Sequence, residues 1–266
     1  MFVVLTEMEY NKCVGFARKC AENQQRIEFG QSDTKPRAVD EISRDNLIGK
    51  MAEVAFSKML HDVYQIDIAL DFNYYPRGEW DDQDAVINGW RIDVKATRKG
   101  GRWMLIEWSK LDFRQKQDKL SHLYVMAIVD WDRNHDLPSR RVEMVGCASV
   151  MKLRPGVPTT LVMRKGTCIP GTSTRLQADN YGIVFSDLEK DWESVIHYIT
   201  THSPPDLGNY PNPYTGKMGS KELLYSAPQH QLNSGSSEMQ GSKVDNRNIL
   251  TRLKTWVGNI CKWIFG

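Results

Sequence analysis

Residues 81–97, DDQDAVINGWRIDVKAT, contain one strong turn signal between two short runs that alternate apolar and polar side chains. The signal is Asn88-Gly89, which favours a two-residue type I′ turn because both central positions of that turn need a positive φ. Such a turn fixes the register of the strands beside it, so we expect a hairpin in which Asp84 lies directly opposite Asp93. The two Cβ atoms of such a pair are about 5 Å apart.

The two faces of this hairpin differ in character, because successive side chains of a strand point to opposite faces. Asp84, Asp93 and Lys95 share one face. Like charges directly opposite each other destabilise a hairpin unless the Lys95 ammonium or a divalent cation compensates them. Mg²⁺ commonly binds proteins through one or two carboxylates. The other face can pack on a core; its members are Ala85, Ile87, Trp90, Ile92 and Val94.

A helix is predicted upstream of the hairpin, because apolar residues recur at helical spacing over residues 46–61. Glu53 lies off this apolar stripe, and Gly49 removes bulk one turn before it. A helical glutamate is usually solvated at the surface. The residues alone therefore leave two interpretations open for Glu53, a solvated side chain or a metal ligand. They also leave a second interpretation of the hairpin, in which it is an exposed hairpin whose acidic residues are simply solvated.

Taken together, Asp84, the run Asp93-Val94-Lys95 and the earlier helix segment Gly49-Lys50-Met51-Ala52-Glu53 resemble the signature of the PD-(D/E)XK nuclease superfamily. In that superfamily the first acidic residue usually follows a proline, whereas Gln83 stands in that place here. The resemblance covers roughly residues 1 to 200. It implies an α/β fold with a restriction-endonuclease-like core, which is a mixed sheet flanked by helices.

The resemblance also implies a chemistry, namely metal-dependent hydrolysis of phosphodiester bonds, with DNA as the partner and endonucleolytic cleavage as the usual mode. The implied catalytic residues are Glu53, Asp84, Asp93 and Lys95. The implied ligands of Mg²⁺, or of Mn²⁺ in its place, are Glu53, Asp84, Asp93 and the carbonyl of Val94. We expect Lys95 to stabilise charge on phosphorus rather than to act as a general base, because a basic lysine needs desolvation and carboxylates beside it oppose the loss of its charge.

Two basic segments follow the hairpin and are candidates for contacts with a nucleic-acid backbone. The first is the loop after residue 97, and the second is a predicted helix over residues 111–120. The candidate residues are Arg98, Lys99, Arg102, Arg114 and Lys116. The alternative is that these charges are simply solvated, as most charge runs are.

The composition narrows the classes of protein that the chain can belong to. A net charge of +2 with 26% charged residues provides no bulk basic field, so nucleic-acid binding would need a local patch. Five scattered cysteines argue against a closed disulfide framework, so we expect reduced thiols and a cytoplasmic setting. No run approaches the roughly 20 apolar residues of a membrane-spanning helix.

The remaining periodicity predicts a succession of further elements around the hairpin. Helices are expected over 6–24 and 188–198, and a loop over 28–42. Strands are expected over 66–72, 103–108, 123–129, 142–150 and 180–185, the third of them buried on both faces because it is a continuous apolar run. His122 is expected to be structural rather than a ligand.

Composition changes after residue 202, which divides the chain into three parts. Residues 1–202 are the expected nuclease-like domain, 203–243 a Pro-, Gly- and Ser-rich linker, and 244–266 an amphipathic basic helix. The helix suits a membrane surface, a protein partner or the core of the chain itself. Two alternative functions follow, an inactive nuclease-fold binding module or an effector nuclease recruited by this helix. Cutting of both DNA strands would favour a homodimer.

Overall fold

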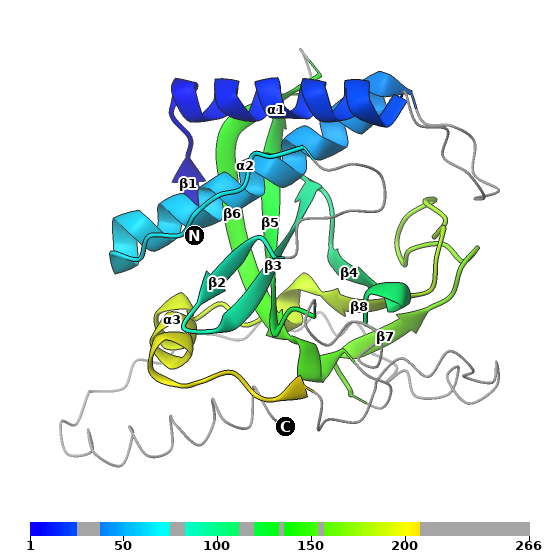
Figure 1. Ribbon diagram of the computed structural model, residues 1–266. Helices are drawn as coiled ribbons and strands as arrows, with labels where there is room; N and C mark the ends of the chain where they lie inside the picture. The colour runs from blue at the N-terminus through cyan, green and yellow to red at the C-terminus, as the bar shows by residue number, and fades with distance from the viewer. Residues whose placement is uncertain (26–37, 75–82, 112–119, 133–135, 154–156, 208–266) are drawn as a thin grey trace, which may run out of the picture.

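A computed structural model describes residues 1–25, 38–74, 83–111, 120–132, 136–153 and 157–207 (Figure 1). Within these ranges the chain is a mixed α/β fold with three α-helices, a five-stranded mixed sheet and a three-stranded sheet. None of the described helices is long and apolar enough to cross a membrane. The four described cysteines are free thiols, and Cys261 lies outside the described residues.

The five-stranded sheet has the order β1-β6-β5-β3-β2. Only the contact between β3 and β5 is parallel; the other three are antiparallel, which makes the sheet mixed. The strands are β1 (Phe2–Val4), β2 (Ala85–Ile87), β3 (Trp90–Arg98), β5 (Leu123–Asp132) and β6 (Leu137–Ser149). The edge strand β1 was not anticipated from the sequence.

The central hairpin forms in the predicted register. Ala85 pairs with Ile92 and Ile87 with Trp90, while Asn88 and Gly89 take φ values of 48° and 81°, as a type I′ turn requires. All five residues of the expected core face are buried, and Trp90 is 1% exposed. The hairpin is also anchored at its tip, because the indole Nε1 of Trp90 donates to a backbone oxygen of the chain that follows the last helix, at 2.7 Å.

The three helices are α1 (Glu7–Gln25), α2 (Val39–Tyr64) and α3 (Trp192–Thr201). The helix predicted over 46–61 was too short, because the first turn of α2, residues 39–42, falls in the stretch expected to be a loop. Ile42 is 4% exposed and extends the buried face of the helix by one more turn. At the other end Gln65 adopts a left-handed conformation with φ of 57°, and its N–H caps the carbonyl groups of the last turn.

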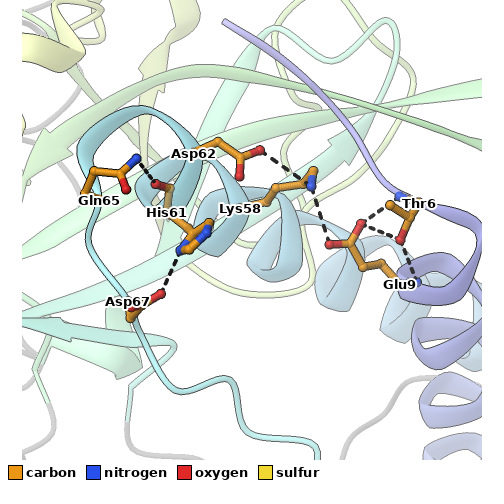
Figure 2. A network of polar contacts seen from close by, with 7 residues as sticks. All are labelled: Thr6, Glu9, Lys58, His61, Asp62, Gln65 and Asp67. Carbon is orange, nitrogen blue, oxygen red and sulfur yellow. Dashed lines mark hydrogen bonds and ion pairs between the residues drawn. The ribbon is translucent and has the colours of Figure 1, made fainter.

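A polar network joins the start of α1 to the end of α2 (Figure 2). The hydroxyl of Thr6 accepts from the backbone N–H of Glu9, whose carboxylate accepts from the N–H of Thr6, so the pair forms a capping box. Lys58 lies 3.7 Å from the carboxylate of Glu9 and 3.5 Å from that of Asp62. Lys58 of α2 thereby forms an ion pair with Glu9 of α1.

The prediction of a strand over residues 66–72 was wrong. This segment returns along α2, but it pairs with no strand in the part of the chain that the structure describes (Figure 1). The alternation of apolar and polar residues does reflect burial, because the side chains that pack on the main core include Ile66, Ile68 and Leu70. The segment covers helices, whose backbone groups are already paired within each helix, so no ladder of hydrogen bonds can form.

Two apolar cores lie on opposite faces of the five-stranded sheet. The helices cover one face, and the second sheet, of order β4-β8-β7, contributes to the core on the other. Strand β5 supplies both cores in alternation, as its continuous apolar run predicts: Val125 faces the helices, while Tyr124 and Met126 face the second sheet. The strands of the second sheet are β4 (Trp103–Glu107), β7 (Thr160–Met163) and β8 (Asn180–Val184).

The packed part of the chain continues beyond residue 202, where the linker was expected to begin. Leu207 is 3% exposed and belongs to the core beneath the second sheet. The rest of the expected linker, from residue 208, and the expected helix over 244–266 lie outside the described residues.

Candidate functional site

The hairpin brings Asp84, Asp93 and Lys95 together at the β2 edge of the main sheet. Asp84 immediately precedes β2, and its Oδ2 accepts from the backbone N–H of Val94 at 2.6 Å. Asp93 and Lys95 are two residues apart on the same face of β3, and the Lys95 Nζ lies 2.5 Å from the Asp93 Oδ1. The ammonium therefore compensates one of the two facing carboxylates, as the sequence suggested.

The carboxyl group of Asp84 is placed where its negative charge is disfavoured. Desolvation by burial raises its pKa well above the ordinary value, and the neighbouring carboxylates of Asp93 and Glu53 raise it further. The Val94 N–H and the Lys95 ammonium oppose this shift without cancelling it. Three carboxylates from two separate parts of the chain thus lie close enough to repel one another.

Glu53 is held toward the interior by a buried lysine, Lys50, one turn earlier on α2. Glu53 is 14% exposed, and its Oε2 pairs with the Nζ of Lys50, which is itself 5% exposed. The same Nζ donates to the backbone oxygen of Asp71 at 2.8 Å and lies 4.5 Å from the ring centroid of Phe16. Glu53 is therefore not a solvated surface side chain, which was one of the two interpretations that the residues alone left open.

Sequence reasoning assigned Lys50 no role, although the spacing of three residues on a helix was a usable signal for an ion pair with Glu53. A buried ammonium requires a nearby negative group and further acceptors. Here the Glu53 carboxylate and the Asp71 carbonyl meet that requirement. Lys50 therefore links the candidate site to the extended segment after α2.

The oxygen donors of the site suit a hard divalent cation. Among the described residues, no three His, Cys, Asp or Glu side chains are already grouped so as to hold a metal ion. Two of the three carboxylates have a lysine as partner instead, Glu53 with Lys50 and Asp93 with Lys95. The mutual repulsion around Asp84 is what an added cation would relieve, so the donor set fits Mg²⁺ or Mn²⁺.

A third lysine lies near the site, on an element that carried no motif. Lys110 lies in the 3-10 helix η1 (Trp108–Leu111), which follows β4. The Lys95 ammonium and desolvation lower its pKa, while the carboxylates of Asp93, Glu107 and Asp84 act in the opposite direction. Much of Lys110 is exposed. No local pattern marks this residue, because only the packing of the second sheet brings it to β3.

A network of hydrogen bonds connects the hairpin to the start of β5. Tyr124 stands beside Asp93 in the parallel register of β3 and β5, and it is 2% exposed. Burial and then the Asp93 carboxylate raise the pKa of its hydroxyl, which is hydrogen-bonded to Ser121. The Ser121 hydroxyl donates to the Oε1 of Gln83 at 2.9 Å. Gln83, the residue where the resemblance leads one to expect proline, is thereby tied to the start of β5.

The basic residues expected beside the site lie elsewhere or carry other contacts. Arg98 falls on the opposite face of β3 from Lys95, and its guanidinium lies 4.2 Å from the ring centroid of Trp131. Lys99 lies 3.8 Å from the carboxylate of Asp130. Arg102 is exposed. Arg98 thus points away from Lys95 and the carboxylates, and its contact with a nucleic-acid backbone stays a prediction. Arg114 and Lys116 lie outside the described residues.

His122 is structural in its contacts. It is 3% exposed, its Nδ1 accepts from the backbone N–H of Arg91 at 3.0 Å, and its backbone N–H donates to the Arg91 carbonyl at 2.8 Å. Burial, with a smaller effect of the Arg91 charge, lowers its pKa to about 4. The neutral ring therefore pins the start of β3 to the start of β5.

Comparisons of the chain with models of protein families, with curated proteins and with solved structures find no match.

Proposed function

We propose that the protein is a metal-dependent nuclease that hydrolyses phosphodiester bonds, with DNA as its substrate and internal cleavage as its mode. The observation that supports this proposal is the meeting of Glu53 with Asp84 and Asp93, evident in the raised pKa of Asp84, next to the Lys95 ammonium. Neither packing nor the hairpin turn requires these acidic side chains to lie near one another. Carboxylate oxygens are the donors that Mg²⁺ and Mn²⁺ prefer.

The roles of the residues follow from charge and position. Glu53, Asp84 and Asp93 would hold Mg²⁺ or Mn²⁺, with the Val94 carbonyl as a further oxygen donor, and the bound cation would polarise the scissile phosphate and acidify a water molecule. Lys95, held in place by Asp93, would stabilise the negative charge that develops on the phosphate oxygens.

Cleavage assays on defined substrates test the proposal. Supercoiled plasmid, linear duplex, single-stranded DNA and RNA are incubated with Mg²⁺, Mn²⁺ or EDTA, using the wild type, Lys95→Ala and the control Lys190→Ala, whose lysine is exposed and outside the site. We expect metal-dependent nicking by the wild type and the control, and its loss in Lys95→Ala. Cleavage that persists in EDTA, or no cleavage of any substrate by the folded wild type, refutes the proposal, and cleavage that persists in Lys95→Ala refutes the role assigned to Lys95. Because a folding defect would mimic lost catalysis, circular dichroism of each variant accompanies the assay.

A second candidate function is a nucleic-acid-binding module without catalysis. It is favoured by the two ion pairs, Lys50 with Glu53 and Lys95 with Asp93, which already neutralise two of the carboxylates. Titration with Mn²⁺ separates the two candidates. Saturable binding that Asp93→Asn weakens supports the nuclease, whereas DNA binding without any metal binding supports the module.

A further inference from the structure

Three aromatic rings meet on the side of α1 that faces the extended segment after α2. The rings of Phe16 and Tyr74 are stacked, with centroids 5.5 Å apart and an angle of 22° between their planes. Phe16 also meets Phe72 edge-on, with centroids 5.7 Å apart. This cluster is not closed to solvent, because Tyr74 is 39% exposed at the surface. The segment thus places one partly exposed aromatic ring, Tyr74, at the surface beside Phe16, and this cluster is called the platform below.

Two lysines of α1 flank the platform. Lys12 lies four residues before Phe16 and Lys19 three residues after it, so the three side chains share one face of the helix. The Nζ of Lys12 lies 3.8 Å from the ring centroid of Phe72, and that of Lys19 lies 5.6 Å from the centroid of Tyr74. Both lysines are exposed. Positive charge and aromatic surface therefore alternate along the same face.

The platform adjoins the candidate site. Lys50 provides the link, because its Nζ is 4.5 Å from the Phe16 centroid and 5.3 Å from the Phe72 centroid while it pairs with the carboxylate of Glu53. One lysine side chain thus separates the aromatic rings from a carboxylate of the site. The aromatic cluster and Glu53 are therefore neighbours of the same buried lysine.

Two exposed ammonium groups on either side of an exposed aromatic ring match the chemistry of a nucleic-acid strand whose bases are unpaired. Bases stack on aromatic side chains, and lysines contact the phosphates between them. A continuous duplex hides the faces of its bases and leaves only phosphates to contact. The platform therefore favours a single strand over a duplex.

We propose that Lys12, Phe16, Lys19 and Tyr74 form a binding surface for single-stranded nucleic acid, with a base stacked on Tyr74 and phosphates beside the two lysines. This inference deepens the proposed nuclease function and rests on it for the role of the strand as substrate. It implies that the enzyme acts on a single-stranded segment or on an unpaired end next to a duplex.

Binding is measured in EDTA, so that no cleavage occurs, by fluorescence anisotropy of labelled single-stranded and duplex oligonucleotides at several salt concentrations. We expect Tyr74→Ala to weaken single-strand binding about tenfold, because stacking on one aromatic ring contributes on that order per base. Tyr74→Phe, which keeps the ring, should restore binding. The control Val63→Ala removes another exposed apolar side chain and should have no effect.

The lysines are tested by the salt dependence of binding. Loss of two phosphate contacts should reduce the slope of log K against log salt by about 1.4 for a single strand, so we expect this change in Lys12→Ala/Lys19→Ala. The matched control is Lys165→Ala/Lys190→Ala, which removes two exposed lysines away from the platform. An equal change in both double variants would overturn the assignment, as would equal loss of duplex and single-strand binding in Tyr74→Ala.

Different experimental results would overturn the binding surface and the nuclease function. Metal-dependent cleavage together with unchanged single-strand binding by Tyr74→Ala overturns the surface and leaves the nuclease. Selective single-strand binding that depends on Tyr74, in a protein that cleaves nothing with either metal, supports the surface and overturns the nuclease. Thermal unfolding of every variant excludes loss of fold as the cause.

Discussion

The buried ring of His122 makes the stability of the fold depend on pH in a predictable direction. Its pKa falls from 6.5 to about 4 on folding, first because of burial and then because of the Arg91 charge, with a hydrogen bond to the Pro205 backbone acting the other way. Between these two values the unfolded chain binds a proton that the folded chain does not. This residue therefore stabilises the fold fully above its unfolded pKa and progressively less as pH falls toward the folded value.

The size of the effect follows from the shift. A difference of this size is worth about 3 kcal/mol when fully expressed and about 2 kcal/mol between roughly pH 7.5 and pH 5. His122→Asn keeps an acceptor near the N–H of Arg91 but cannot titrate in this range. We expect the free energy of unfolding of the wild type to fall by about 2 kcal/mol more than that of His122→Asn over this interval.

Urea unfolding at the two pH values, followed by circular dichroism, measures this difference. Comparing the variant with the wild type cancels the contribution of other groups, including Asp84, whose raised pKa acts in the opposite direction on acidification. His61→Asn serves as the control, since His61 is 60% exposed at its side chain and lies in the network at the end of α2. The reasoning is refuted if the wild type and His122→Asn lose the same stability on acidification.

Three further predictions concern the site and the boundary of the fold. Lys50→Met should lower the free energy of unfolding by about 3 kcal/mol, because it leaves Glu53 without its buried partner. Urea unfolding measures this change, and added Mn²⁺ should raise the stability of the variant more than that of the wild type. Ser121→Ala should lower kcat and leave the melting temperature nearly unchanged, because it removes the hydroxyl that donates to Gln83, the residue before Asp84. A steady-state assay at saturating metal and a thermal melt of the variant test this. A chain truncated after residue 202 should be less stable, by about 2 kcal/mol, than one truncated after Leu207, because it loses the burial of that leucine; urea unfolding of the two chains measures the difference.

Local sequence patterns were sufficient to predict the register of the hairpin and the burial of β5. The Asn88-Gly89 turn determines which residues pair, because a two-residue turn admits one register, and that register alone places Asp84 beside Asp93. The continuous apolar run of β5 likewise predicts burial on both faces, which Tyr124 and Val125 display on opposite sides. These features depend on residues that are close together in the sequence.

Tertiary structure decided the features that depend on a partner distant in the chain. Whether residues 66–72 join a sheet depends on the neighbour they meet, and they meet helices. The surroundings of Lys50 and Lys110 are likewise set by packing, the first against the segment after α2 and the second through the second sheet. Sequence periodicity reports which face of an element is buried. It does not report what lies against that face, because that choice is made by the free energy of packing the whole chain at once.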